Sequence, residues 1–323
     1  MKKILVFGSF NYDMTARVED FPKPGQTIMG LSFETGPGGK GSNQAIAAHR
    51  AGAEVVFATK IGNDSFGSCA LETFKNEGMG TDCILKDGSL PTSSAFITVH
   101  SGSGQNSIVV NKGACSHIST SDIDGICAEL ASSGIILTQL ETNLSAVEEV
   151  VAAAKQNGAT VILNPAPAAE ISDKIYKNVD IITPNETEAE ALTGVAVSSA
   201  AGMEGAAKQL ISRGVKTVIL TLGSKGAYVC DGGSSYLVPA FPSKAIDTTG
   251  AGDVFNGALA AALSFDMELR GAVEFACAAG AISVTRPGAA LSAPVKAEIE
   301  ELISTTSVRS EQGMFCKLKE ELK

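Results

Sequence analysis

The sequence predicts an α/β fold: a three-layer, mostly parallel sheet with helices on both faces, and a small antiparallel β lid. First, short runs of β-branched residues alternate with segments whose apolar residues recur every three or four positions, as in sheets covered by helices. Second, 44% of the 323 residues are apolar, which is enough for a large core without disulfides or a structural metal. Third, two strand-like segments around a glycine-containing turn interrupt the alternation.

The expected strands of the main sheet are short runs rich in Val, Ile and Leu: Ile4–Phe7, Val55–Thr59, Ile135–Leu140, Thr160–Leu163, Val179–Thr183 and Thr217–Leu222. Helices are expected between them, for example over Ala146–Gln156 and Met203–Ser212. In this architecture ligands bind beyond the carboxyl ends of the strands. Polar residues that directly follow a strand are therefore candidate site residues.

The lid is expected from two parts of the chain. Ser94–His100 and Asn106–Asn111 flank a five-residue Ser/Gly turn and predict a hairpin, and residues from about 11 to 35 also have an extended pattern. Neither part could bury a core alone, so we expect one domain over residues 1–303 that includes the lid. A tail over 304–323 follows, with a polar linker and then a helix predicted by Met314, Leu318 and Leu322.

Composition excludes several classes of protein. The formal net charge of −10 argues against a nucleic-acid partner, which normally requires a cationic face. No apolar run approaches the length of a membrane span, and the N-terminal apolar run is too short for a signal peptide. The seven cysteines are widely spaced and include no C-x-x-C pair, so we expect reduced thiols in a cytoplasmic protein.

The strongest local motif is Asp247-Thr248-Thr249-Gly250-Ala251-Gly252-Asp253, followed by a helix over Val254–Ser264. Glycines allow a tight turn, and the N-terminus of the following helix presents unpaired N–H groups and a positive dipole end. Such a loop can bind the charge of a transferred phosphoryl group, and Asp253 beside it could accept a proton from an attacking hydroxyl. The alternative is an ordinary helix start in which Asp253 only stabilises the dipole.

The second motif, Gly36-Pro37-Gly38-Gly39-Lys40-Gly41-Ser42-Asn43-Gln44, contains a G-x-G-x-x-G pattern before a helix over Ala45–Ala51. A dinucleotide-binding fold requires these glycines directly after the first strand, but about 25 residues intervene. A P-loop requires Ser or Thr after the lysine, where this chain has Gly41. The remaining interpretations are a simple tight turn or a loop that grips a polyhydroxylated ligand.

Further candidates follow the predicted strands. Asn11, Asp13 and Glu141 would meet at one crevice and suit a neutral sugar, although each also fits an ordinary turn or strand end. Asn185-Glu186-Thr187-Glu188 could organise magnesium through water or be a plain N-cap. The segment Thr221–Gly226 could face a nucleotide phosphate or be only a glycine turn.

Taken in order, these segments resemble the PfkB family of carbohydrate kinases from about Lys3 to Ile303. The resemblance rests on Gly8-Ser9-Phe10-Asn11-Tyr12-Asp13, Gly38–Gln44, Asn164-Pro165-Ala166-Pro167, Thr183–Glu188 and Asp247–Asp253. It implies transfer of the γ-phosphoryl group of ATP to the 5-hydroxyl of D-ribose. The alternatives are a kinase for 2-deoxyribose or another small sugar, and more distantly a non-catalytic sugar-binding protein on the same fold.

The resemblance also implies roles for individual residues. Asp253 matches the catalytic base, and Gly250, Ala251 and Gly252 match the anion hole. Positions that match sugar contacts are Asn11, Asp13, Gly38, Gly39, Lys40, Asn43, Glu141 and Asp253. Positions that match nucleotide contacts are Asn185, Thr221, Gly223, Ser224, Gly226, Gly252 and Cys277.

Metal ions and a partner subunit are implied in the same way. Glu188 belongs to the motif that organises Mg²⁺ through water. An activating K⁺ is expected at Asp247, Thr249, Ser283, Arg286, Gly288 and Ser292. Relatives dimerise through their lid sheets, so a homodimer is expected. Two residues depart from the family pattern: Cys115 replaces the usual Asn near the lid, and Cys277 stands where His is common.

Overall fold

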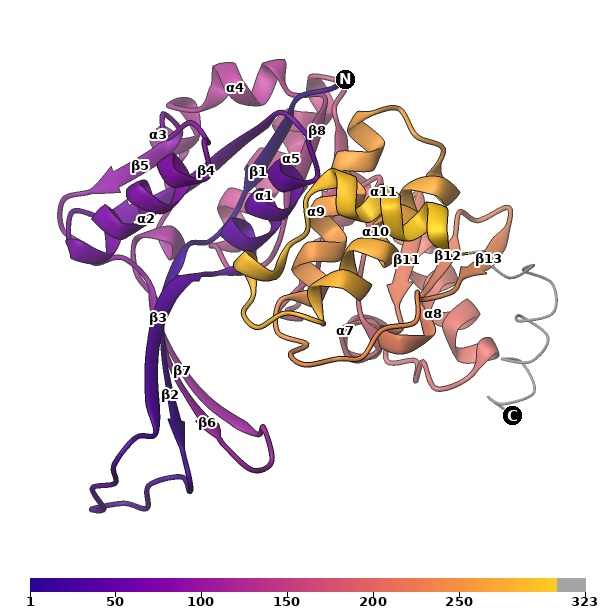
Figure 1. Ribbon diagram of the computed structural model, residues 1–323. Helices are drawn as coiled ribbons and strands as arrows, with labels where there is room; N and C mark the ends of the chain where they lie inside the picture. The colour runs from indigo at the N-terminus through magenta and orange to yellow at the C-terminus, as the bar shows by residue number, and fades with distance from the viewer. Residues whose placement is uncertain (307–323) are drawn as a thin grey trace.

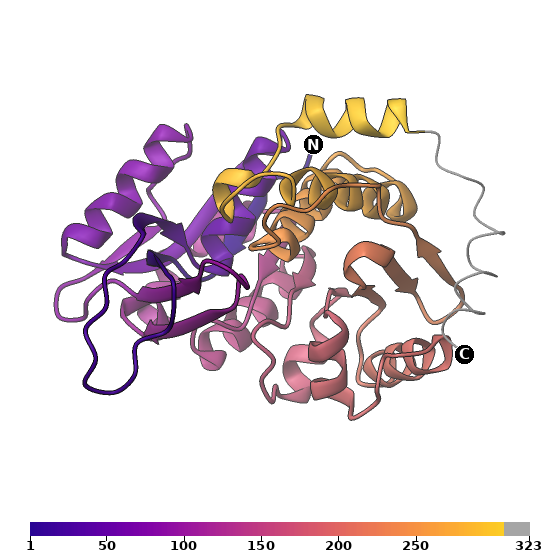
Figure 2. The ribbon, with the colours of Figure 1, turned by 60° about the horizontal axis from the view of Figure 1, so that its bottom comes forward.

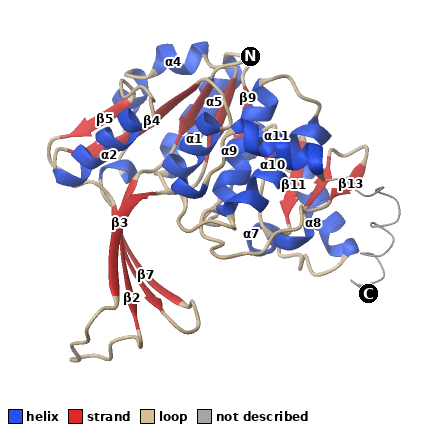
Figure 3. Cartoon of the chain, viewed as in Figure 1, coloured by secondary structure: helices blue, strands red, loops and turns tan. Residues whose placement is uncertain are grey.

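A nine-stranded sheet runs through the body of the protein, and the computed structural model describes residues 1–306 (Figures 1 and 3). Its strand order is β13-β12-β11-β10-β9-β8-β1-β4-β5. All neighbours from β5 to β11 pair in parallel, whereas β11, β12 and β13 pair antiparallel. The bounds are β1 (Ile4–Phe7), β4 (Val55–Gly62), β5 (Ile84–Asp87), β8 (Ile135–Thr138), β9 (Thr160–Leu163), β10 (Ile181–Ile182), β11 (Thr217–Thr221), β12 (Ala227–Cys230) and β13 (Ser235–Val238).

Helices cover both faces of this sheet, as expected. Successive β1 side chains alternate between two buried clusters: Ile4 and Val6 pack on one side, and Leu5 and Phe7 on the other. The first side is covered by α1 (Lys40–Arg50), α2 (Ser65–Asn76), α9 (Ala251–Ser264), α10 (Leu269–Ser283) and α11 (Lys296–Thr305). The second is covered by α3 (Thr120–Asp124), α4 (Cys127–Ser132), α5 (Leu144–Gln156), α6 (Asp173–Lys177), α7 (Glu186–Thr193) and α8 (Ala200–Ser212).

The lid is a four-stranded sheet that projects from the body (Figure 1). Its strands are β2 (Asn11–Val18), β3 (Ser32–Gly38), β6 (Ser94–His100) and β7 (Asn106–Asn111), in the order β3-β2-β6-β7. The outer pairs β2–β3 and β6–β7 are antiparallel, as expected, but the central β2–β6 pair is parallel, so the lid is a mixed sheet. Both strands follow strands of the main sheet that end at the same edge, β1 and β5, so they leave the body in the same direction.

The chain leaves the body through α11, which lies along one side of the molecule in Figure 2. Ser304 and Thr305, expected to begin a linker, are instead the last residues of this helix. The helix predicted from Met314, Leu318 and Leu322 lies outside the described residues. Within residues 1–306, no helix has both the length and the apolar character needed to cross a membrane.

Candidate active site

Polar side chains gather beyond the carboxyl ends of the parallel strands, where the sequence placed the site. A cavity of about 880 Å³ opens there. Its lining includes Lys40, Asn164, Asn185, Glu188, Thr221, Gly223, Ser224, Gly226, Gly250, Ala251, Gly252, Asp253 and Cys277. The residues expected at the anion hole, at the nucleotide and at Mg²⁺ therefore share one cavity with Lys40.

The glycine loop before α9 forms one wall of this cavity. Gly250 is the N-cap of α9 and has a left-handed backbone with φ of 72°. The first N–H groups of a helix have no intrahelical partner, so this turn can bind an anion. A Cβ built on Gly252 would meet no atom within 4 Å, which shows that the loop faces open space.

Asp253 is held by side chains of α1. It is 6% exposed; Asn43 Nδ2 donates to its Oδ2 over 2.9 Å, and Gln44 Nε2 donates to its Oδ1 over 2.9 Å. The two helices approach closely at Gly257, where a Cβ would lie 2.5 Å from the Gln44 carbonyl oxygen. Asn43 Oδ1 is buried without a hydrogen-bond partner among the described residues, so it is a free acceptor beside Asp253.

The residues expected at the sugar lie at the base of the lid, next to this cavity. Asn11 at the start of β2 pairs with Gly38 at the end of β3, and Gly39 is the N-cap of α1. Glu141, beyond β8, accepts hydrogen bonds from the Ser9 hydroxyl and from Lys40 N, the latter over 2.8 Å. This contact ties the end of β8 to the start of α1.

Charge is balanced across the site by one lysine. Burial, and secondarily the charge of Glu141, raise the pKa of Asp13 to about 7. Burial alone would lower the pKa of Lys40, but the charges of Asp253, Glu141 and Glu188 raise it overall. Lys40 therefore stays cationic between the sugar-side and cavity-side carboxylates.

The segment Asn185–Glu188 forms a helix cap. Asn185 Oδ1 accepts from the Glu188 N–H over 2.8 Å, and Glu188 Oε2 accepts from the Asn185 N–H over 2.9 Å. This capping box uses one carboxylate oxygen of Glu188. Burial raises the pKa of Glu188 although the Asn185 hydrogen bond and Lys40 oppose the shift.

Cys277 also lines the cavity. Burial raises the pKa of the Cys277 thiol to about 12, so this side chain is neutral.

The residues expected at K⁺ lie on two joined loops beside the glycine loop. Asp247 Oδ1 accepts from the Thr249 N–H over 2.9 Å, and its Oδ2 accepts from the Gly288 N–H over 3.0 Å. Burial alone would raise the pKa of Asp247, but these hydrogen bonds lower it. The Ser283 and Ser292 hydroxyls donate to backbone carbonyls, and Arg286 pairs with Glu298 of α11.

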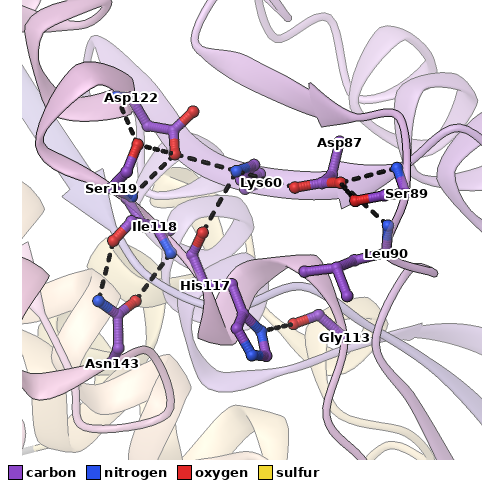
Figure 4. A network of polar contacts seen from close by, with 10 residues as sticks. All are labelled: Lys60, Asp87, Ser89, Leu90, Gly113, His117, Ile118, Ser119, Asp122 and Asn143. Atoms are coloured by element: carbon purple, nitrogen blue, oxygen red, sulfur yellow. Dashed lines mark hydrogen bonds and ion pairs between the residues drawn. The ribbon is translucent and has the colours of Figure 1, made fainter.

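A partly buried ion cluster connects the lid to the main sheet (Figure 4). Lys60 Nζ lies 2.9 Å from Asp87 Oδ2 and 3.0 Å from Asp122 Oδ2, and it donates to the His117 carbonyl over 3.2 Å. Asp87 Oδ1 accepts from the Leu90 N–H before β6 over 2.9 Å, whereas His117 follows β7. Lys60 therefore connects both ends of the lid hairpin. Beside them, Cys115 is buried, 3.0 Å from the Ser93 hydroxyl.

Four buried polar side chains around the site received no role from the sequence. They are Ser9, Gln44, Gln139 and Asn164, which lie beyond β1, in α1, beyond β8 and beyond β9. The available signal was a polar residue inside or directly after an apolar strand, as at Gln139 within the apolar run Ile135–Leu140. Such a residue is buried, so it needs a polar partner.

With this geometry in place, comparison with known proteins defines the class. The sequence profile described as pfkB family carbohydrate kinase matches residues 1–296. The chain belongs to this family.

Individual relatives indicate which kind of carbohydrate kinase the chain resembles. The chain is 45% identical over 302 residues to a protein named ribokinase from Haemophilus influenzae, covering 94% of this chain and 98% of that protein. It is 35% identical over 302 residues to a deoxyribokinase from Salmonella typhi, covering 93% and 98%. The structure of Arabidopsis thaliana ribokinase complexed with ribose and ATP superimposes with a TM-score of 0.88 at 30% identity, covering 94% and 99%. The protein is thus a ribokinase-like, ATP-dependent sugar kinase.

Proposed function

We propose that the protein transfers the γ-phosphoryl group of ATP to the 5-hydroxyl of D-ribose and releases D-ribose 5-phosphate. The observation that carries this proposal is the position of Asp253. Its carboxylate accepts a hydrogen bond from Asn43, whose Oδ1 is an unpaired acceptor, and it lines the same cavity as the open glycine loop at Gly252. A base that adjoins both a hydroxyl-binding group and an anion pocket is the arrangement that phosphoryl transfer to an alcohol requires.

In this proposal, separate groups of residues bind the sugar, accept the proton and stabilise the transferred phosphoryl group. Asn11, Asp13, Asn43 and Glu141 accept sugar hydroxyls, and Gly38 and Gly39 shape the base of the lid. Asp253 takes the proton of the 5-hydroxyl as its oxygen forms a bond to the γ-phosphorus and the bond to the β-phosphate oxygen breaks. The N–H groups of Gly250, Ala251 and Gly252, with Lys40, stabilise the charge of the moving phosphoryl group.

ATP occupies the cavity wall opposite the lid in this proposal. Asn185, Thr221, Gly223, Ser224, Gly226 and Cys277 contact the nucleotide. Among residues 1–306 no group of three or more His, Cys, Asp or Glu side chains could hold a metal ion. Mg²⁺ would therefore depend on the phosphates and on Glu188 acting through water, as is usual for this ion, and would neutralise phosphate charge.

The loops around Asp247 fit a monovalent cation. The hydrogen bonds from the N–H groups of Thr249 and Gly288 orient the Asp247 carboxylate, and the hydroxyls of Ser283 and Ser292 retain free lone pairs. Oxygen donors of this kind suit K⁺. Bound there, the ion would stabilise the glycine loop without contacting the sugar.

The lid supports a homodimer. Its strands expose apolar side chains that a monomer would leave in water: Phe33 is 66% exposed, Phe96 53% and Val109 65%. A second copy of the chain is the partner that we propose for this surface.

The free thiols of the described cysteines and the use of ATP support a cytoplasmic location.

A sugar panel tests the substrate. Turnover of ATP, coupled to ADP detection, is measured with ribose, 2-deoxyribose and other small sugars in the presence of Mg²⁺, with and without K⁺. We expect the highest kcat/KM with ribose and stimulation by K⁺. A higher kcat/KM with 2-deoxyribose would support the alternative sugar. Sugar binding without any ATP turnover would support a non-catalytic binding protein.

A further inference from the structure

The carboxylate of Asp253 determines how the Gln44 amide is turned, because a carboxylate accepts hydrogen bonds and donates none. Gln44 Nε2 donates to Asp253 Oδ1 over 2.9 Å and to Asn164 Oδ1 over 3.0 Å. The Gln44 oxygen therefore faces away from Asp253. It accepts a hydrogen bond from Gln139 Nε2 over 2.7 Å, so both ends of the amide are used.

Gln139 is linked to Asp253 through Gln44: it donates to Gln44, which in turn donates to Asp253. It is 1% exposed, and its own Oε1 is buried without a hydrogen-bond partner among residues 1–306. The absence of a side chain at Gly8 makes room for this oxygen, since a Cβ there would lie 2.1 Å away. An unpaired buried carbonyl is unfavourable. The orientation of Gln139 is thus explained by its donor, which faces Gln44, and not by its oxygen.

We propose that Gln139 is a positioning residue for phosphoryl transfer: through Gln44 it keeps an N–H donor directed at Asp253 Oδ1. This inference rests on the proposed role of Asp253 as the base. With Gln44 on Oδ1 and Asn43 on Oδ2, the carboxylate plane is fixed. Each oxygen retains a further lone pair, which remains for the sugar hydroxyl.

The test reverses the polarity of one amide at nearly constant shape. In Gln139→Glu, an ionised carboxylate would face the Gln44 oxygen. Either Gln44 turns and directs its oxygen at Asp253, or the new carboxyl group stays protonated and donates a hydrogen bond to the Gln44 oxygen. We therefore expect kcat to fall at least tenfold at pH 8, and the ratio of variant to wild-type kcat to recover as the pH is lowered.

Two further variants separate polarity from packing. Gln139→Met retains most of the volume without a donor, so its loss of kcat should be smaller and independent of pH. Thr138→Val, the matched control, removes a neighbouring buried hydroxyl that has no partner among the described residues, and should leave kcat unchanged. The charged groups of the site are Asp13, Lys40, Glu141, Glu188 and Asp253, and Asp13 titrates near pH 7. Taking the ratio of variant to wild-type kcat at each pH removes their common effect.

A stability measurement makes the test independent of turnover. In the Asp253→Asn background, the new amide nitrogen can donate a hydrogen bond to the oxygen of a turned Gln44. Gln139→Glu should therefore lower the thermal midpoint less in this background than in wild type. The positioning role is wrong if Gln139→Glu and Gln139→Met lose the same kcat at every pH and the midpoint shifts are equal in both backgrounds. Unimpaired turnover in Asp253→Asn would instead refute the base itself.

Discussion

Asn43 Nδ2 donates a hydrogen bond to Asp253 Oδ2 over 2.9 Å, although 210 residues separate them in the chain. Asn43 belongs to the first turn of α1, at the base of the lid, and Asp253 to the first turn of α9, at the cavity. This hydrogen bond therefore joins the residues that we propose for the sugar to the proposed anion pocket.

Two neighbouring glycines should respond differently to alanine. Gly250 has φ of +72°, and a Cβ there would lie 2.8 Å from Ala289 Cα, so Gly250→Ala should cost about 2 kcal/mol of unfolding free energy as well as activity. A Cβ on Gly252 would meet only open space, so Gly252→Ala should keep full stability. It should still lower kcat on the order of 100-fold by obstructing the anion pocket.

Chemical denaturation and steady-state kinetics measure these effects. Gly271→Ala in α10 is the matched control, because its Cβ would also meet no atom within 4 Å and the residue lies outside the site. A Gly252→Ala enzyme with near-normal kcat would show that the phosphoryl group does not pass this loop.

Because the pKa of Asp13 is raised to about 7 and we propose that this residue contacts the sugar, we expect sugar binding to depend on pH. The ionised carboxylate is the form that accepts sugar hydroxyls, so KM for ribose should rise as the pH falls below about 7. Asp13→Asn should have a high KM that no longer changes over this range. A wild-type KM that stays constant from about pH 6 to about pH 8, on either side of this pKa, would contradict the assignment.

The same shift affects stability in the sugar-free protein. The unfolded value is near 3.8, so the stabilising effect of protonated Asp13 is fully present below that pH and is lost as the pH rises through about 7. Above pH 7 the buried charge costs up to roughly 4 kcal/mol, so Asp13→Asn should be more stable than wild type at pH 8. Unfolding in urea without sugar measures the difference, and a less stable variant would contradict it.

Lys60 should affect sugar binding through the lid (Figure 4). Lys60→Met leaves the carboxylates of Asp87 and Asp122 without their shared cation, and should lower the free energy of unfolding. Because both ends of the lid hairpin depend on this lysine, KM for ribose should rise as well. Lys155→Met removes one of the two lysines that pair with Asp180 away from the lid, and should lower stability without changing KM. Equal KM values in the two variants would contradict the lid role.

The exposed lid strands should carry the dimer contact. Phe96 and Val109 face each other across β6 and β7, and both are more than half exposed. Phe96→Asp combined with Val109→Asp should convert a species of twice the 33.0 kDa chain mass into a monomer, measured by light scattering. Val295→Asp, an exposed apolar residue outside the lid, is the control. A wild-type protein that is monomeric at all concentrations would contradict the proposal.

Local patterns predicted much of the fold. Ile4–Phe7 and Thr160–Leu163 match β1 and β9 at both ends, because buried parallel strands are short β-branched runs with clear boundaries. Ile84–Asp87 was missed, because its pattern contains Lys86 and Asp87 and only Ile84 is buried. The parallel β2–β6 pair was also missed, because it depends on where two distant strands leave the main sheet.

The candidate site was predictable to a similar degree. Residues in glycine motifs or directly after strands, such as Asp253 and Asn185, were found because their local sequence is unusual. The Gln44–Gln139 hydrogen bond joins residues 95 apart in the chain, and neither residue is distinctive by itself. Partners of this kind appear only when α1, α9 and the main sheet are assembled.

Asp253→Asn tests the central claim most directly. The substitution keeps the shape of the side chain but removes the proton acceptor, so ribose binding, measured by calorimetry, should change by less than about tenfold while kcat falls by a factor on the order of 1,000 or more. A variant with near-normal kcat, or one that loses ribose binding as completely as turnover, would show that Asp253 is not the base.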